Sequence, residues 1–349
     1  MKKLYVPVLA LLTLASCSKS ELANRPVVEN DMVEIMATSK ALTIETRAPF
    51  EGSIAIGNEL TAVVLGSTTS GDYTETTPRY CDGEMTFTDD NTTPVSFATN
   101  KQYYPVSDAT VYFCALYPTA LADWKDIATT AKYTFDGKTD VMAAAEKEGK
   151  KSTAMAGTHP SFEFKHLLTK LVVKVKAQDE AAQNVWGDIT AISLAKAAGA
   201  DVYTTAEVTL KDGTAATGTA FSDATADGMA FYRIDAAATP AYTDNAVDAT
   251  DNKIELTTDA VEAAYSLVAP FTAKNGNTHL VLKVTTKLDA TETVKDVDVI
   301  LKDAEGNDYA GDTQGNAFEI TLTFKATDIQ ATATVKDWTE GGNSEIEIQ

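Results

Sequence analysis

The sequence predicts an all-β protein made of two β-sandwiches in tandem. After Pro49 the chain consists mainly of short apolar runs separated by clusters of Gly, Asp, Asn and Thr, which is typical of sandwich strands and their turns. Its 349 residues are enough for two domains of ordinary size, each with its own core. The content of 44% apolar and 8% aromatic residues is that of a globular chain rather than a disordered one.

The first 17 residues have the pattern of a lipoprotein export signal. A positive start, Met1-Lys2-Lys3, precedes the apolar run from Leu4 to Leu14. This run is too short to cross a hydrocarbon core of roughly 30 Å as a helix. It ends in Leu14-Ala15-Ser16-Cys17, which matches a bacterial lipobox, and we predict that Cys17 carries the lipid. The alternative is an ordinary signal peptide with a chance cysteine.

The strands can be placed from the apolar runs that follow the signal. A polar tether from Ser18 to about Asn30 leads to residues 32–44, whose apolar side chains suit one short strand. Two alanine-rich stretches, Asp140–Lys147 and Asp179–Val185, predict a turn or two of helix each. The clearest further strands are predicted at Leu60–Leu65, Val111–Leu116, Leu171–Val175, Thr278–Thr285 and Val294–Leu301.

A weak internal repeat supports two similar domains, because three pairs of segments occur in the same order in both halves. We therefore predict an N-terminal sandwich over residues 48–180 and a C-terminal sandwich over residues 186–338. A second possibility is that the stretch from Phe162 already opens the second domain. The matching pairs are Glu59–Leu65 with Asp188–Leu194, Val111–Pro118 with Ala264–Pro270, and Phe162–Phe164 with Phe318–Ile320.

The charge balance argues against a nucleic-acid partner. The chain has 29 Lys and Arg against 50 Asp and Glu, a formal net charge of -21. Such a surface repels phosphates and anionic headgroups. Arginine is scarce, so Arg47, within a stretch between predicted strands, is conspicuous.

No catalytic, cofactor or metal site can be recognised, and we predict that the protein is not an enzyme. The histidines are His159, His166 and His279, and none lies in a metal-binding pair. No nucleophile elbow or phosphate-binding glycine loop is present in the sequence. His166 is interpreted as a strand residue packed near the domain junction.

The remaining cysteines and the tryptophans are assigned to structure. Cys81 and Cys114 either form a disulfide or stay apart, with Cys114 as a small core residue of an apolar strand. The three tryptophans, Trp124, Trp186 and Trp338, lie far apart in the sequence, which favours separate core positions over a surface platform.

This combination resembles the fimbrillin family, the pilin-like lipoproteins that build type V fimbriae. The resemblance covers the whole chain and is carried by the lipobox at Cys17, Thr46–Phe50, Phe162–Leu171 and Ala333–Trp338. It implies two transthyretin-like β-sandwich domains. It also implies a lipidated precursor at the outer membrane, an arginine-specific protease, and fimbrial anchor and tip proteins as partners.

By the same resemblance, the protease cuts between Arg47 and Ala48. The cut removes a propeptide, residues 18–47, whose segment Met32–Ile44 contains the first strand. The groove left behind is filled by a strand from a neighbouring copy, to which the extension 339–349 contributes. The shaft of a cell-surface fimbria is then a head-to-tail polymer that supports adhesion.

The C-terminal residues have the alternation that such a donor strand needs. Ile346 and Ile348 fall on one face, and Glu345 and Glu347 on the other. Gly341-Gly342 before them can act as a hinge. The alternative is a frayed acidic tail. Two other functions also stay open: an anchor or tip subunit of the same fimbria, and a surface lipoprotein that binds glycans.

The lipobox generates the first prediction. Cys17→Ala removes the thiol that accepts lipid, so the precursor is expected to stay unprocessed and short of the outer membrane. Cell fractionation and the mass of the precursor measure this. Normal surface fibres made by the variant would contradict it.

Overall fold

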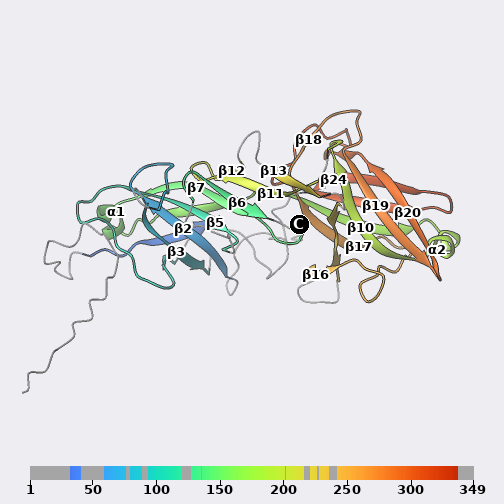
Figure 1. Ribbon diagram of the computed structural model, residues 1–349, viewed down its shortest axis with the longest axis horizontal. Helices are drawn as coiled ribbons and strands as arrows, with labels where there is room; N and C mark the ends of the chain where they lie inside the picture. The colour runs from blue at the N-terminus through green and yellow to red at the C-terminus, as the bar shows by residue number, and fades with distance from the viewer. Residues whose placement is uncertain are drawn as a thin grey trace, which may run out of the picture. The chain divides into compact units, whose positions relative to one another are not determined.

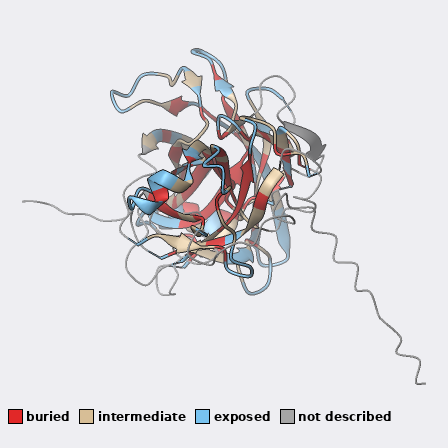
Figure 2. Cartoon of the chain, turned by 90° about the vertical axis from the view of Figure 1, so that its left-hand side faces the viewer, coloured by how far each residue is buried: buried red, intermediate tan, exposed pale blue. Residues whose placement is uncertain are grey.

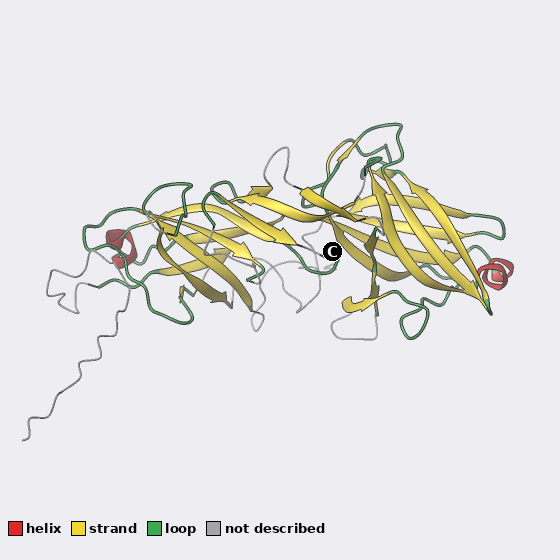
Figure 3. Ribbon diagram, in the orientation of Figure 1, coloured by secondary structure: helices red, strands yellow, loops and turns green. Residues whose placement is uncertain are grey.

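The computed structural model describes residues 32–40, 59–75, 79–88, 93–119, 127–134, 136–200, 202–215, 221–225, 228–235 and 242–336. Within these ranges nearly all regular structure is β-strand, with two short helices (Figure 3). The predicted all-β class is therefore confirmed. Each of the five further strands predicted from apolar runs lies on an observed strand or strand pair.

The first part of the chain forms a seven-stranded sheet, called sheet A, in the order β3-β2-β5-β7-β8-β1-β4. Neighbouring strands are antiparallel except β1 and β8, which are parallel. Its members are β1 (Met36–Lys40), β2 (Leu60–Ser67), β3 (Arg79–Phe87), β4 (Val95–Ser96), β5 (Val111–Tyr117), β7 (Met142–Gly149) and β8 (Ser161–His166).

Sheet A encloses an aromatic core. Phe87 of β3 lies with its ring centroid 6.1 Å from those of both Phe162 and Phe164 of β8. Tyr104 packs edge-on against Phe113 of β5. Figure 2 shows buried residues gathered on strands at the centre of the view and exposed residues on the surrounding loops. Edge-to-face aromatic pairs contribute about 0.5–1.5 kcal/mol beyond the area that they bury.

The later part of the chain forms a sandwich of two sheets. Sheet B has the order β14-β10-β19-β20, and sheet C has the order β16-β15-β17-β9-β23-β24-β21. Sheet B consists of β10 (Asp188–Ala197), β14 (Met229–Ala230), β19 (Leu280–Leu288) and β20 (Thr291–Val299). Sheet C consists of β9 (Thr169–Ala177), β15 (Tyr232–Ile234), β16 (Tyr242–Ala246), β17 (Val261–Val268), β21 (Leu301–Lys302), β23 (Ala317–Phe324) and β24 (Ile329–Lys336).

Strict alternation builds the core between sheets B and C. Every second residue is buried from Leu280 to Thr286 in β19 and from Phe318 to Phe324 in β23, and the residues between them are more exposed. Because successive side chains of a strand point to opposite faces, each strand has one face in the core. The inward residues include Leu280, Leu282 and Val284 of β19 and Phe318, Ile320, Leu322 and Phe324 of β23.

A third set of strands connects the two parts. β11 pairs with β6 over five residues, from Thr205 opposite Thr134 to Thr209 opposite Thr130 (Figure 1). Thr130 Oγ1 also donates to Glu207 Oε1 at 2.7 Å. This linking sheet consists of β6 (Thr130–Thr134), β11 (Val202–Thr209), β12 (Thr214–Ala215) and β13 (Phe221–Thr225), and a separate small ladder joins β18 (Thr272–Ala273) to β22 (Gly311–Asp312).

Loop residues in the first part of the chain also contact sheet C directly. The backbone N–H of Leu267 in β17 donates to the carbonyl of Gly137 at 2.7 Å. The Tyr232 hydroxyl donates to the carbonyl of Asp136 at 2.9 Å. Buried residues of β2, β5, β11 and β23 belong to one continuous core cluster. The limits of two tandem domains, 48–180 and 186–338, therefore stay a prediction. Strand pairing shows that the chain passes from sheet A to sheet C at Leu167-Leu168.

The two alanine-rich stretches differ in outcome. Residues 180–186 form helix α2 (Glu180–Trp186), whose first turn is capped by Asp179 accepting from the Ala182 N–H. Residues 142–149 form β7, so the predicted helix over Asp140–Lys147 is wrong. β7 pairs with β5 and β8 on its two edges, and this pairing outweighs the helix propensity of alanine. The other helix is α1 (Lys151–Met155).

Cys81 and Cys114 do not form a disulfide. Cys81 faces the core enclosed by sheet A, and Cys114 lies in the core cluster on the other side of that sheet. They pair with the consecutive residues Gly66 and Leu65 of β2, so the two thiols point to opposite faces. Burial raises the pKa of the Cys114 thiol to about 12. The prediction of Cys114 as a core residue is confirmed.

The linking sheet generates a prediction at Gly213. Its φ is +61°, and a Cβ atom there would lie 2.5 Å from the backbone nitrogen of Ala145 in β7. Gly157 also has a positive φ, +80°, but a Cβ would meet no atom within 4 Å. Gly157→Ala is expected to lower the free energy of unfolding by about 1–2 kcal/mol through φ alone. Gly213→Ala is expected to lower it by roughly 1–3 kcal/mol more through the clash.

Denaturant unfolding of both variants measures this difference. Equal losses for Gly213→Ala and Gly157→Ala would show that the β11–β12 turn does not press against β7.

Candidate functional site

The candidate site is the groove in sheet A that holds β1 and the three residues before it. Val33, Ile35, Ala37 and Ser39 alternate with more outward residues and point toward the core. Ile35 is 1% exposed and Ala37 is 2% exposed. A segment from the beginning of the chain therefore supplies part of the core of sheet A.

The backbone of this segment is paired along both edges. On one side β1 runs parallel to β8, with Thr38 opposite Ser161 and Ser39 opposite Phe162. On the other side β1 is antiparallel to β4. Ahead of β1, the Ile35 N–H donates to the Gln102 carbonyl at 2.7 Å. The segment thus occupies the position of an internal strand, and its removal would expose unpaired donors and acceptors on both neighbours.

The walls of the groove are apolar at their base and charged at the rim. Phe162, which pairs with Ser39, is fully buried. Phe97, which directly follows β4, is also buried. At the rim, Lys101 Nζ lies 2.7 Å from Glu34 Oε2. The hydrogen bond that the Lys101 ammonium group donates to the Glu34 carboxylate raises the pKa of Lys101. The segment in the groove therefore places apolar side chains at the base and a carboxylate beside Lys101.

β1 fills the groove imperfectly. The Ser39 hydroxyl is buried and has no hydrogen-bond partner among the described residues, and the same is true of Glu34 Oε1. A buried polar group without a partner costs about 1–3 kcal/mol. The inward position of Ala37 holds only a methyl group.

The residues that the sequence analysis assigned to processing and exchange lie outside the described part of the chain. These are Cys17, Arg47, Ala48, Glu345, Ile346, Glu347 and Ile348. Their roles stay predictions. Of the predicted strand segment 32–44, the structure describes residues 32–40, which contain β1.

Sequence reasoning did not find the residues that receive β1. Lys101, Gln102 and Tyr104 lie in a loop with no strand pattern, and the parallel partner β8 is far away in the sequence. The available signal was the alternation Phe162-Glu163-Phe164, which marks β8 as a half-buried strand but not its neighbours.

Other polar clusters have structural roles. His166 Nδ1 lies 2.7 Å from Asp140 Oδ2, and both side chains are largely buried. His279 is 1% exposed and bridges two backbone groups through its ring nitrogens. Within the described ranges no three His, Cys, Asp or Glu side chains are grouped as metal ligands. The predicted core position of Trp186 is confirmed, while Trp124 and Trp338 lie outside the described residues.

For the described part of the chain, neither helix has the length and apolar character that a membrane crossing requires.

Comparison with known proteins identifies the family. The profile of the fimbrillin-like family matches residues 46–338, so the chain belongs to this family. Membership supports a role as a fimbrial subunit in an appendage of the cell surface. No curated protein matches the chain.

One solved structure supports the fold. A candidate cell adhesion protein from Bacteroides uniformis has 21% identity and a TM-score of 0.50, over 88% of this chain and 100% of that chain. A fimbrial protein from Bacteroides vulgatus has 16% identity and a TM-score of 0.47, over 88% of this chain and 99% of that chain. At these identities the first similarity is evidence of the fold alone.

The groove generates a prediction about the uncleaved chain. Ile35→Ala leaves a cavity in the core of sheet A and is expected to lower the free energy of unfolding by about 2–5 kcal/mol. Met36→Ala, the next residue of the same segment and on its outward face, is the matched control and is expected to have a much smaller effect. Chemical denaturation of the two variants measures this. Equal effects would show that Ile35 is not part of the core.

Proposed function

We propose that the protein is a shaft subunit of a cell-surface fimbria and polymerises by donor-strand exchange after proteolysis. The observation that carries this proposal is β1. It fills an internal position of sheet A and is the first of the described strands, so the chain joins it to the other described strands through the segment that leads to β2. One cut in that segment separates β1 from the sheet without breaking any other described strand.

Arg47 supplies the cleavage point in the proposal. It lies after β1, which ends at Lys40, and before β2, which begins at Leu60. The precursor is held at the outer membrane by lipid on Cys17, and an arginine-specific protease cuts between Arg47 and Ala48. The released propeptide leaves an open groove with an apolar base.

The C-terminal tail of another copy is the proposed replacement, because it repeats the sequence pattern of the segment that leaves. Glu34-Ile35-Met36-Ala37 matches Glu345-Ile346-Glu347-Ile348 in its carboxylate and its alternating apolar positions. In this register Ile346 takes the place of Ile35, Ile348 the place of Ala37, and Glu345 lies beside Lys101. The tail runs in the same direction as β1, parallel to β8.

The exchange is favoured by the side chains that it replaces. Burying Ile346 and Ile348 contributes about 1.5–3 kcal/mol each, whereas the propeptide offers one isoleucine and one alanine in the same row. Each backbone hydrogen bond of the new ladder adds roughly 0.5–1.5 kcal/mol net. Because the donor strand and the groove are different parts of the subunit, head-to-tail repetition gives an open fibre, to which anchor and tip proteins add at the ends.

The test uses two tail variants and one matched control. Ile346→Asp with Ile348→Asp places charge against the apolar base, so folded monomers that form no fibres are expected. Glu347→Gln changes an outward position and is expected to leave assembly intact. Arg47→Ala is expected to block assembly by retaining β1. Electron microscopy and the gel mobility of unheated samples measure assembly, and circular dichroism confirms folding.

Fibres of wild-type length from the double aspartate variant would refute the donor-strand role of the tail. Sequencing of sheared fibres is expected to find Ala48 at the N-terminus. A start at Cys17 would instead indicate an anchor subunit or a lipoprotein that stays on the membrane.

A further inference from the structure

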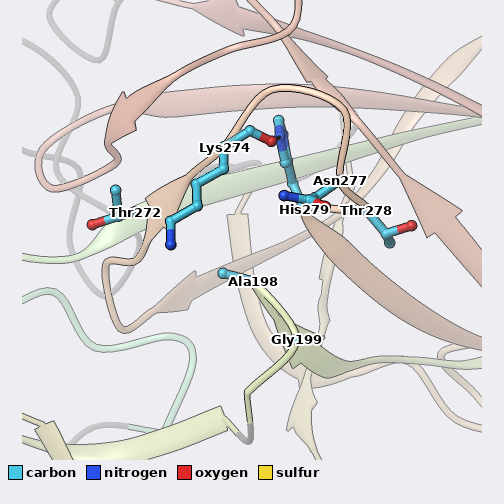
Figure 4. Close-up of a pocket in the computed structure, with 7 residues that line it drawn as sticks. All are labelled: Ala198, Gly199, Thr272, Lys274, Asn277, Thr278 and His279. Carbon is cyan, nitrogen blue, oxygen red and sulfur yellow. Dashed lines mark hydrogen bonds between the residues drawn. The ribbon is translucent and has the colours of Figure 1, made fainter.

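A cavity of about 610 Å³ opens in the later part of the chain, away from the β1 groove. It lies between the turn at Ala198-Gly199, which joins β10 to β11, and the loop that leads from β18 to β19 (Figure 4). Its polar lining comes from Thr272, Lys274 and the neighbouring Asn277-Thr278. This volume is within the range of roughly 300–1,000 Å³ that is usual for small-molecule sites.

An apolar slot of about 210 Å³ adjoins this cavity. Ala198 lines both spaces, so they meet at the turn. The slot is walled by aromatic and aliphatic side chains, among them Tyr203 of β11 and Phe271, which directly precedes β18. The polar cavity and the apolar slot with its aromatic side chains therefore meet at Ala198.

The loop on one side of the cavity is firmly held. The buried ring of His279 donates from Nε2 to the Lys274 carbonyl and accepts at Nδ1 from the Leu301 N–H, both at 3.0 Å. Asp308 accepts from the Gly276 N–H at 3.1 Å and pairs with Lys302. These contacts fix the backbone of residues 274–279 before any ligand arrives.

The slot and the turn are equally fixed. Phe271 exchanges two hydrogen bonds with the Thr313 hydroxyl, which in turn accepts from Thr169 Oγ1 at 2.8 Å. Ala198 has a φ of +48°, which is uncommon for a residue other than glycine, and its N–H donates to the His279 carbonyl. Strain of this kind persists where the surroundings determine the conformation, and it is frequent at ligand sites.

The backbone around the cavity is held by these hydrogen bonds, whereas the polar side chains that line it are available to bind a ligand. Thr272, Lys274, Asn277 and Thr278 make no side-chain hydrogen bond or ion pair with another described residue. In Figure 4 the Lys274 side chain extends from the loop toward the turn at Ala198. Lys274 carries the one full charge among the described lining residues, in a chain whose net charge is -21.

We propose that this cavity binds an acidic saccharide. The carboxylate of the sugar pairs with Lys274, and its hydroxyls bond to the hydroxyls of Thr272 and Thr278 and to the Asn277 amide. Its less polar ring face lies against Tyr203 and Phe271. One cation suits a monocarboxylate, whereas a polyphosphate requires several cations or a cradle of free N–H groups.

This site is built within one subunit and does not depend on strand exchange, so each proposal can fail without the other. The test is isothermal titration calorimetry of the purified full chain with three probes: 3′-sialyllactose, a glucuronate-containing disaccharide, and lactose as the neutral reference. The two acidic probes are expected to bind more tightly than lactose by roughly tenfold, the effect of one charge-assisted hydrogen bond. This preference is expected to shrink as salt is raised.

Lys274→Met keeps the length of the side chain but removes its charge, and it is expected to abolish the preference for the acidic probes. Asn277→Ala is expected to weaken both acidic probes. Lys295→Met, at an exposed position of β20, is the matched control and is expected to leave the affinities unchanged. Circular dichroism checks that each variant is folded.

The relative affinities of the two acidic probes distinguish a sialic acid from a uronic acid as the preferred sugar. Absence of binding by both acidic probes at millimolar concentration would overturn the proposal. Equal binding of lactose and the acidic probes, or a Lys274→Met variant that binds them as the wild type does, would overturn it as well.

Discussion

Both parts of this structure depend on parallel pairing between an early strand and a late one. In sheet A, β1 lies parallel to β8, and in sheet C, β9 lies parallel to β23. Parallel pairing requires a long crossover between the partners, so each core closes only after most of its part of the chain is in place. The two early strands differ in one respect. β9 follows β8 after two residues and leads into α2, whereas β1 leads through residues 41–59 to β2. A single cut between β1 and β2 can therefore separate β1 and leave β9 in place.

The sequence was sufficient for the fold class because its strands are short apolar runs, some alternating and some nearly continuous, bounded by turn residues. The alternation in Thr278–Thr285 and the continuous apolar run in Leu60–Leu65 each placed a strand. The Asp140–Lys147 stretch failed because alanine gives no period by which a buried strand can be told from a helix, and only pairing with β5 and β8 decides between them. α2 was predictable because Asp179 provides a local cap.

The candidate sites were less accessible to sequence reasoning. The segment of β1 was indicated by its apolar residues and the family resemblance, but its partners at Lys101 and Gln102 were not, because nothing local connects them to it. The cavity beside Lys274 had no signal in the sequence. Thr272, Lys274 and Asn277 are ordinary loop residues, and His279 was considered only as a metal ligand. What makes the place distinctive is that buried neighbours hold its backbone while its side chains stay uncommitted, and a linear pattern does not record this.

The pairing of β6 with β11 has a mechanical consequence. In the proposed strand-exchanged fibre, tension would enter a subunit through sheet A and leave it through the C-terminal end. Between these points the chain passes from sheet A to sheet C at Leu167-Leu168. The β6–β11 ladder and the contacts of Gly137 and Asp136 also join the two parts, so they would carry part of the tension alongside this covalent connection. Pulling the two parts away from each other must break several hydrogen bonds and open a common core at the same time. The subunit then behaves as a stiff element, and compliance in the fibre falls to the joints between copies.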